Sequence, residues 1–74
     1  MKILVLGATG MLGHKLARVL ADEKMEVLGT VRAGAARWEA HPALRGIPLI
    51  EGVRAEDIDS VVGALARARP AAVV

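Results

Sequence analysis

The sequence predicts an α/β domain in which helices pack on a parallel sheet. Short apolar runs typical of strands alternate along the chain with segments whose apolar residues recur at helical spacing. Hydrophobic residues make up 54% of the 74 residues, but only one residue, a tryptophan, is a large aromatic. Such a composition suits layered strands and helices. The length allows one domain or part of one.

Composition and charge exclude several classes of protein. The net charge is +2, and the ten basic residues are scattered without interleaved aromatics, so no nucleic-acid surface is predicted. No apolar run approaches the roughly 20 residues that span a bilayer, and no signal peptide is recognisable. The absence of cysteine and the separation of His14 from His41 give no disulfide or metal site. We expect a cytoplasmic protein.

The first half of the chain predicts two strands joined by a helix. Residues 2–6 form a nearly continuous apolar run that ends at Gly7, as in a central strand buried on both faces. Residues 26–31 form the second strand, reached by a right-handed crossover. The helix between them ends at residues 22–24. Its predicted sheet-facing stripe consists of Leu12, Leu16, Val19 and Leu20.

A weak pattern follows the second strand. Residues 35–40 predict a short helix, and residues 47–51 predict a third strand. Pro48 lacks the amide proton that a central strand needs, so this strand should begin there or lie at an edge of the sheet. An edge position fits the strand order 3-2-1-4.

The last part of the chain predicts one more helix and a fourth strand. The helix covers residues 55–68, with acidic side chains in its first turn, basic ones at its end and Pro70 after it. Residues 71–74 begin a buried strand, so we expect the chain to be part of a larger domain. The predicted stripe of the helix is Ile58, Val61, Val62 and Leu65.

Three glycines lie in the turn between the first strand and the first helix. Gly7 permits the tight turn, Gly10 lets a phosphate approach the backbone, and Gly13 lets the helix pack closely. Amide protons around Met11 and Leu12 lie at the positive end of the helix dipole. This arrangement predicts a pyrophosphate site, and the alternative is a tight turn that binds nothing. The Thr9 hydroxyl would either cap the helix or touch a phosphate.

The glycine turn and its flanking strands resemble the N-terminus of an extended or atypical short-chain dehydrogenase/reductase. Within that superfamily the chain is most similar to sugar-nucleotide reductases and epimerases of the dTDP-4-dehydrorhamnose reductase type. The resemblance implies the first half of a Rossmann-type, doubly wound parallel sheet over residues 1–74, a nicotinamide dinucleotide cofactor, and hydride transfer to or from a sugar carbonyl in a longer parent protein. The order would be β-α-β-(α)-β-α-β.

The end of the second strand predicts which nicotinamide cofactor binds. An acidic residue there would bond the ribose diol of NAD, and a basic residue would accept the 2′-phosphate of NADP. This sequence places Arg32 about 20 residues past the glycines, with no carboxylate beside it, and so favours NADP, while NAD stays possible. A solvated arginine is the alternative. Arg37 is a weaker candidate for a phosphate ligand.

The loop after the third strand is the other landmark of the resemblance. The family usually has an aspartate followed by an aliphatic residue against the adenine ring. Here Gly52 and Val53 supply the aliphatic side chain without the acid. Trp38 is expected to anchor the short helix to the core rather than to shield the adenine. His14 is expected at the surface.

No catalytic set is recognisable in the chain. The resemblance implies a catalytic tyrosine, but the chain has none, and its only serine, Ser60, falls inside a predicted helix. Two hypotheses follow: the cofactor-binding segment of an NADP-dependent sugar-nucleotide reductase, or a self-contained NAD(P)-binding regulatory or sensor module. The free edge of the fourth strand predicts that the isolated chain self-associates.

Overall fold

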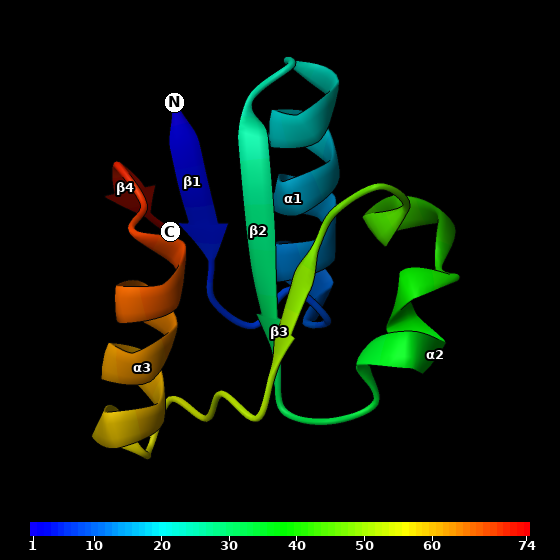
Figure 1. Cartoon of the computed structure of the whole chain (residues 1–74). Helices are drawn as coiled ribbons and strands as arrows, with labels where there is room; N and C mark the ends of the chain where they lie inside the picture. Colours follow the sequence, from blue (N-terminus) through cyan, green and yellow to red (C-terminus); the bar gives the residue numbers. More distant parts are fainter.

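A computed structural model describes all residues from 1 to 74 (Figure 1). Four parallel strands form one sheet in the order β3-β2-β1-β4, which confirms the predicted α/β fold and its strand order. The strands are β1 (Lys2–Val5), β2 (Glu26–Val31), β3 (Leu49–Glu51) and β4 (Ala72–Val73). The helices are α1 (Met11–Asp22), α2 (Ala35–Glu39), the 3₁₀ helix η1 (Pro42–Leu44) and α3 (Ile58–Ala68).

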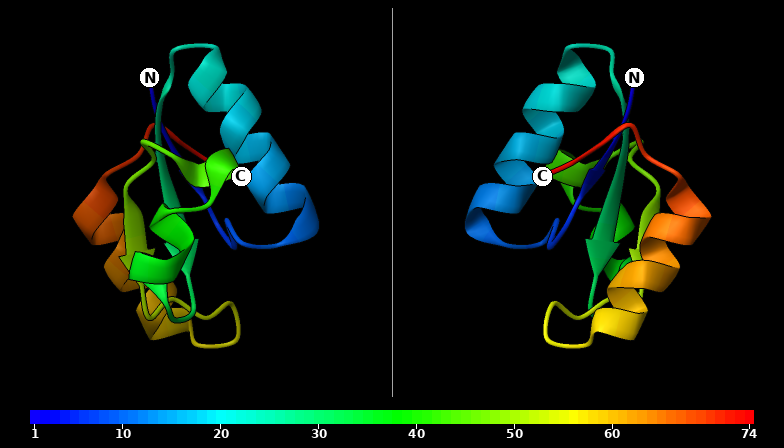
Figure 2. Two further views of the ribbon diagram at one scale, coloured as in Figure 1. Left: turned by 90° about the vertical axis from the view of Figure 1, so that its right-hand side faces the viewer. Right: turned by 90° about the vertical axis from the view of Figure 1, so that its left-hand side faces the viewer.

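The helices cover the two faces of the sheet. Helix α1 lies on one face and α3 on the other, as the two side views show (Figure 2). Alternate residues of β1 point to opposite faces, so Ile3 and Val5 belong to the core under α1, whereas Leu4 belongs to the core under α3. None of the helices has both the length and the apolar character needed to cross a membrane.

The strand positions follow from hydrogen bonding. Strand β1 pairs with β2 on one side and β4 on the other, and it is buried as predicted. Strand β3 lies at the edge and begins at Leu49, two residues later than expected. Pro48 explains the late start: its carbonyl accepts a hydrogen bond from the Gly29 amide at 2.9 Å, but its ring nitrogen has no proton to donate.

The stripe predicted for α1 is half wrong. Leu16 and Leu20 are partly buried, but Leu12 is 78% exposed and Val19 is 58% exposed. Ala17 is fully buried instead. The helix lies close to the sheet through small residues, and Leu12 and Val19 are left on its outer side.

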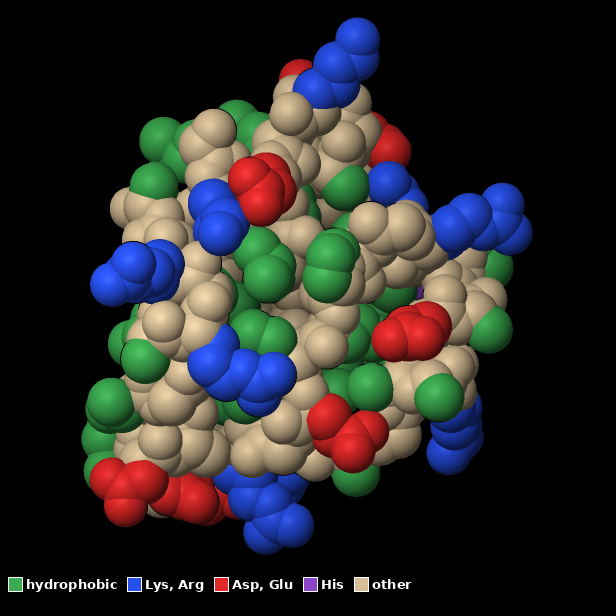
Figure 3. All heavy atoms as spheres, in the orientation of Figure 1, with side chains coloured by type: hydrophobic (Ala, Val, Ile, Leu, Met, Phe, Trp, Pro, Cys, Tyr) green, Lys and Arg blue, Asp and Glu red, His purple; other side chains and the backbone are tan.

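The stripe predicted for α3 fails in the same way. The helix begins at Ile58 rather than at residue 55, and Ile58 and Val62 are mostly exposed. Ala64 and Ala68 are buried against the sheet. In the space-filling view, apolar side chains gather along the margin formed by α3 (Figure 3).

Candidate functional site

The turn between β1 and α1 is built on two glycines with different tasks. Gly7 has a φ of 68°, in the left-handed region that other residues rarely adopt. Its carbonyl accepts a hydrogen bond from the Gly10 amide at 3.0 Å. A Cβ atom at Gly13 would overlap this same carbonyl oxygen. Because Gly13 has no side chain, the start of α1 can lie directly against the backbone of Gly7.

Thr30, in β2, holds this turn in place. Its hydroxyl oxygen accepts a hydrogen bond from the Gly7 amide at 2.9 Å, and its carbonyl accepts one from the Ala8 amide at 2.9 Å. Thr30 is only 1% exposed. Sequence analysis did not identify this residue. The available signal was a hydroxyl in an otherwise apolar strand, because a buried hydroxyl needs a partner.

The N-terminus of α1 is open. Its N-cap is Gly10, no side chain caps it, and its first turn contains no acidic residue. The amides of Met11, Leu12 and Gly13 consequently have no hydrogen-bond partner in the chain. Of the two alternatives for the Thr9 hydroxyl, capping of the helix is not observed. An anion placed here would meet unpaired donors and the positive end of the helix dipole.

A cavity of about 220 Å³ lies beside the turn. It brings three of the predicted site residues together, Gly7, Arg32 and Val53. Val53 is 7% exposed and so contributes a firmly packed apolar wall. The other predicted residues, Thr9 to Gly13, do not line this cavity. The remaining lining residues are Leu6, Thr30, Ala55, Glu56 and Val61.

Arg32 is already paired in this cavity. One guanidinium nitrogen of Arg32 lies 2.9 Å from a carboxylate oxygen of Glu56, and both side chains remain largely exposed. Glu56 was expected in the first turn of the last helix, but it precedes that helix. No sequence signal pairs two residues that lie 24 positions apart.

The other sequence candidates lie away from the cavity. Arg37 lies on α2, with its guanidinium carbon 6.0 Å from the centre of the Trp38 ring. Trp38 packs against the core under α1, as expected. His14 and His41 meet edge to face at 5.9 Å despite their separation in sequence, and His14 also bonds the Gly10 carbonyl at 2.7 Å. No group of three metal-binding side chains occurs.

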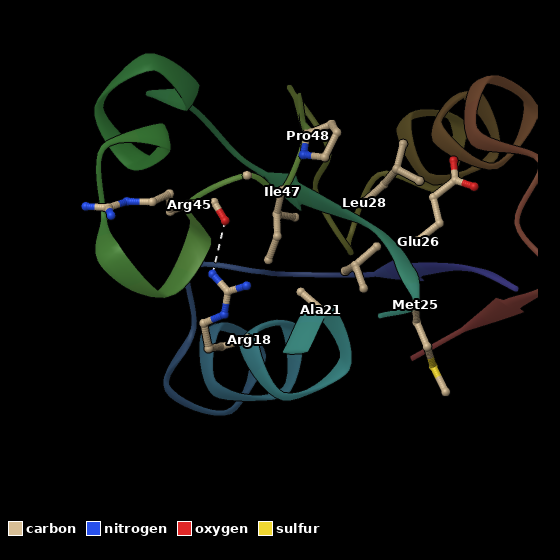
Figure 4. A pocket seen from close by; sticks show the side chains of 10 residues that line it. Arg18, Ala21, Met25, Glu26, Leu28, Arg45, Ile47 and Pro48 are labelled. Atoms are coloured by element: carbon tan, nitrogen blue, oxygen red, sulfur yellow. Dashed lines mark hydrogen bonds between the residues drawn. The ribbon is translucent and has the colours of Figure 1, made fainter. Parts of the chain in front are cut away.

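The largest cavity, about 450 Å³, lies elsewhere, between the end of α1 and the start of β2. Arg18 lines one side and donates to the Arg45 carbonyl at 3.0 Å (Figure 4). It also donates to the Asp22 carboxylate at 3.1 Å. The Arg45 side chain points away from the cavity. The cavity contains none of the residues predicted to bind the cofactor, and Arg18 is held by these two bonds.

The chain contains no acid–base set. The Ser60 hydroxyl is used structurally: it accepts from the Arg54 amide at 2.9 Å and lies 2.8 Å from the Asp57 carbonyl. All hydrogen-bond partners of this hydroxyl are backbone groups, so no side-chain base is bonded to it that would activate it as a nucleophile. The site described above consists of unpaired amide donors at the start of α1 and a partly apolar cavity beside the turn.

Comparisons with known proteins identify the family of the chain. Residues 3–74 match the model of the NAD dependent epimerase/dehydratase family. The chain is also similar to a crystal structure described as "a putative epimerase from Burkholderia cenocepacia J2315", with 36% sequence identity and a TM-score of 0.80. That match covers 97% of this chain and 23% of the other. A search of curated protein sequences gives no match. The chain belongs to the NAD-dependent epimerase/dehydratase family, whose Rossmann-type segment binds NAD(P).

Proposed function

We propose that residues 1–74 are the cofactor-binding segment of an NADP-dependent reductase that acts on a sugar nucleotide, of the dTDP-4-dehydrorhamnose reductase type. One observation carries the proposal: the open N-terminus of α1 lies at the same end of the sheet as the cavity that contains Arg32. An anion site and an adenosine site are thus adjacent. The residues proposed to bind the cofactor are Gly7, Thr9, Gly10, Met11, Leu12, Gly13, Arg32 and Val53.

The pyrophosphate would bind at the start of α1. The unpaired amides of Met11, Leu12 and Gly13 are suitable donors for its oxygens. Gly10 has no side chain to obstruct the approach of a phosphate to the backbone. Thr9, in the turn, is half-buried and would lie beside the phosphates.

The adenosine would occupy the 220 Å³ cavity. Val53 offers an apolar wall for the adenine, and Arg32 offers a guanidinium for the 2′-phosphate of NADP. A guanidinium binds a phosphate bidentately, whereas it gains much less from a neutral ribose diol. This difference favours NADP over NAD.

When bound, the nicotinamide cofactor would exchange a hydride with a sugar carbonyl. The residues of this chain would bind and orient the adenosine diphosphate half of the cofactor. The chain spans 23% of the length of the similar crystal structure. We therefore place the acid–base residues and the sugar-binding residues of the proposed reductase outside residues 1–74.

Nucleotide titration of the chain tests this proposal. The probes are NADPH and NADH, and binding is followed by NMR shifts of the Gly7, Met11 and Leu12 amides. Replacing Arg32 with Asp should weaken NADPH binding at least tenfold and leave NADH binding unchanged or improved, because the new carboxylate repels the 2′-phosphate and accepts from a ribose diol. The matched control is Arg37→Asp, which makes the same charge change outside the cavity. Equal losses for both cofactors would make Arg32 a structural residue.

The isolated chain is also proposed to self-associate through β4. This strand has no neighbour on its outer side, and Val73, Val74 and Leu6 expose apolar surface beside that edge. An uncovered apolar strand edge favours pairing with another chain. We expect dimers or larger species in sedimentation equilibrium at micromolar concentration. A stable, cooperatively folding monomer would contradict this and would favour a self-contained NAD(P)-binding sensor module.

A further inference from the structure

The ion pair between Arg32 and Glu56 bears on cofactor choice. Both side chains line the cavity proposed for adenosine, and their charged groups are 2.9 Å apart. Arg32 is the residue on which a preference for a 2′-phosphate depends. In this structure the position of a phosphate against that guanidinium is taken by a carboxylate of the protein itself.

The segment that carries Glu56 is fixed by several hydrogen bonds. The Ser60 hydroxyl bonds both the amide and the carbonyl of Arg54, at 2.9 and 3.0 Å. The Asp57 amide donates to the Arg54 carbonyl at 3.0 Å. Asp57 in turn caps α3. Glu56 thus lies between Arg54 and Asp57, whose backbones are hydrogen-bonded, and its side chain lines the cavity.

The two cofactors would meet this carboxylate differently. A 2′-phosphate carries between one and two negative charges, so it must displace Glu56 from Arg32 and is then repelled by it. A ribose diol is neutral, and its hydroxyls can donate to a carboxylate. The same pair of residues therefore contains one group that attracts the 2′-phosphate and one that opposes it.

We propose that Glu56 is a specificity-determining residue that limits the preference of the site for NADP over NAD. It competes with the 2′-phosphate for the Arg32 guanidinium and provides an acceptor for the ribose diol. This inference rests on the proposed cofactor site, and it adds a residue that opposes the selectivity of Arg32. Because of Glu56, the site would bind both cofactors and would favour NADP over NAD only modestly.

The experiment measures binding of adenosine 2′,5′-bisphosphate and of 5′-AMP to the full chain. These probes contain the adenosine half of NADP and of NAD, and NMR titration measures weak affinities for both. Replacing Glu56 with Gln should strengthen binding of the bisphosphate about fivefold, which is the size expected from releasing an exposed ion pair and removing a nearby like charge. Binding of 5′-AMP should stay the same or weaken slightly. The gain should shrink at high salt.

Two controls make the measurement specific. Glu23→Gln removes the same charge from an exposed position at the end of α1, and should leave the ratio of the two affinities unchanged. In an Arg32→Ala background, Glu56→Gln should give a clearly smaller gain, because no guanidinium remains to be released. An equal gain in that background would overturn the competition with Arg32.

The outcomes separate this inference from the proposed function. If the unmodified chain binds both probes with shifts at Gly7 and Thr30, the cofactor site stands. An affinity ratio that Glu56→Gln then changes by less than twofold, or shifts toward 5′-AMP, overturns the role of Glu56 alone. If neither probe perturbs these amides, the proposed cofactor site fails, and the role of Glu56 fails with it.

Discussion

The two long helices begin in similar ways but end up with different N-termini. Each follows a strand and a glycine in the left-handed conformation, Gly7 before α1 and Gly52 before α3. The start of α3 is closed by Asp57, whose carboxylate accepts from the Asp59 and Ser60 amides at 3.2 and 3.4 Å. The start of α1 has no such cap. The uncapped helix end is the one at which the proposed pyrophosphate would bind.

The largest expected effect distinguishes Gly13, which lies against the glycine turn, from Gly63, which is exposed on α3. Gly13→Ala should destabilise the fold by about 3 kcal/mol, because the new Cβ would overlap the Gly7 carbonyl. The matched change Gly63→Ala lies in α3, where the added Cβ would meet no atom within 4 Å. It should stabilise the fold by about 0.5–1 kcal/mol through helix propensity. Urea unfolding followed by far-UV circular dichroism measures both, and similar values would contradict the comparison.

The second effect concerns the hydrogen bond by which Thr30 holds the glycine turn. Thr30→Val keeps the shape of the side chain but removes the oxygen that accepts from the Gly7 amide. We expect a loss of about 2 kcal/mol in unfolding free energy, because a partly buried donor loses its partner. Thr30→Ser keeps the oxygen and should recover the Gly7 hydrogen bond, visible in the NMR shift of that amide. A valine variant as stable as the parent would mean that water replaces the hydroxyl at no cost.

The third effect is expected from removing the cap at the N-terminus of α3. Asp57→Ala removes the cap of α3 and should cost about 1 kcal/mol. Asp57→Asn preserves an oxygen acceptor and should cost less than half of that. Thermal unfolding of the three proteins provides the test. Equal stability of the alanine variant and the parent would show that the cap contributes nothing, and would weaken the contrast with α1.

The smallest effect on stability is expected from adding a cap to the N-terminus of α1. Gly10 has φ and ψ of −71° and 165°, which any residue adopts, so Gly10→Asp should fold and stabilise the chain by a few tenths of a kcal/mol through capping. The same carboxylate would occupy the unpaired amides and repel a pyrophosphate. Binding of NADPH should therefore fall at least tenfold while stability is kept. Undiminished binding would place the pyrophosphate elsewhere.

The fold could be predicted from the sequence, but the buried faces of the helices could not. Apolar residues surround much of α1 and α3, so more than one stripe at helical spacing is available. Large side chains such as Leu12 and Ile58 dominate any count of hydrophobicity, yet both are exposed. The sheet-facing side of α1 is fixed by Gly13 and Ala17, because only small residues permit the close approach to the turn.

Only the local part of the candidate site could be predicted from the sequence. The glycine turn is local, so Gly7, Gly10 and Gly13 can be identified from their spacing and from the strand and helix around them. The contacts of Thr30 and Glu56 are set by the crossing of distant segments. The sequence does not show which partner either residue has, although the hydroxyl of Thr30 in an apolar strand indicates that it needs one. Both partners were found only when β2 and the loop before α3 were placed beside the turn.

The hydrogen bonds of Thr30 join the glycine turn to a residue 23 positions later in the chain. The turn therefore cannot make these hydrogen bonds while β2 is detached from β1. Its Gly7 and Ala8 amides should exchange with solvent deuterium only when the two strands separate. The Met11 amide, a few residues away, is free to exchange in the folded protein. Hydrogen exchange at Gly7 and Ala8 would thus measure the separation of the strands, and exchange at Met11 would measure the accessibility of the helix N-terminus.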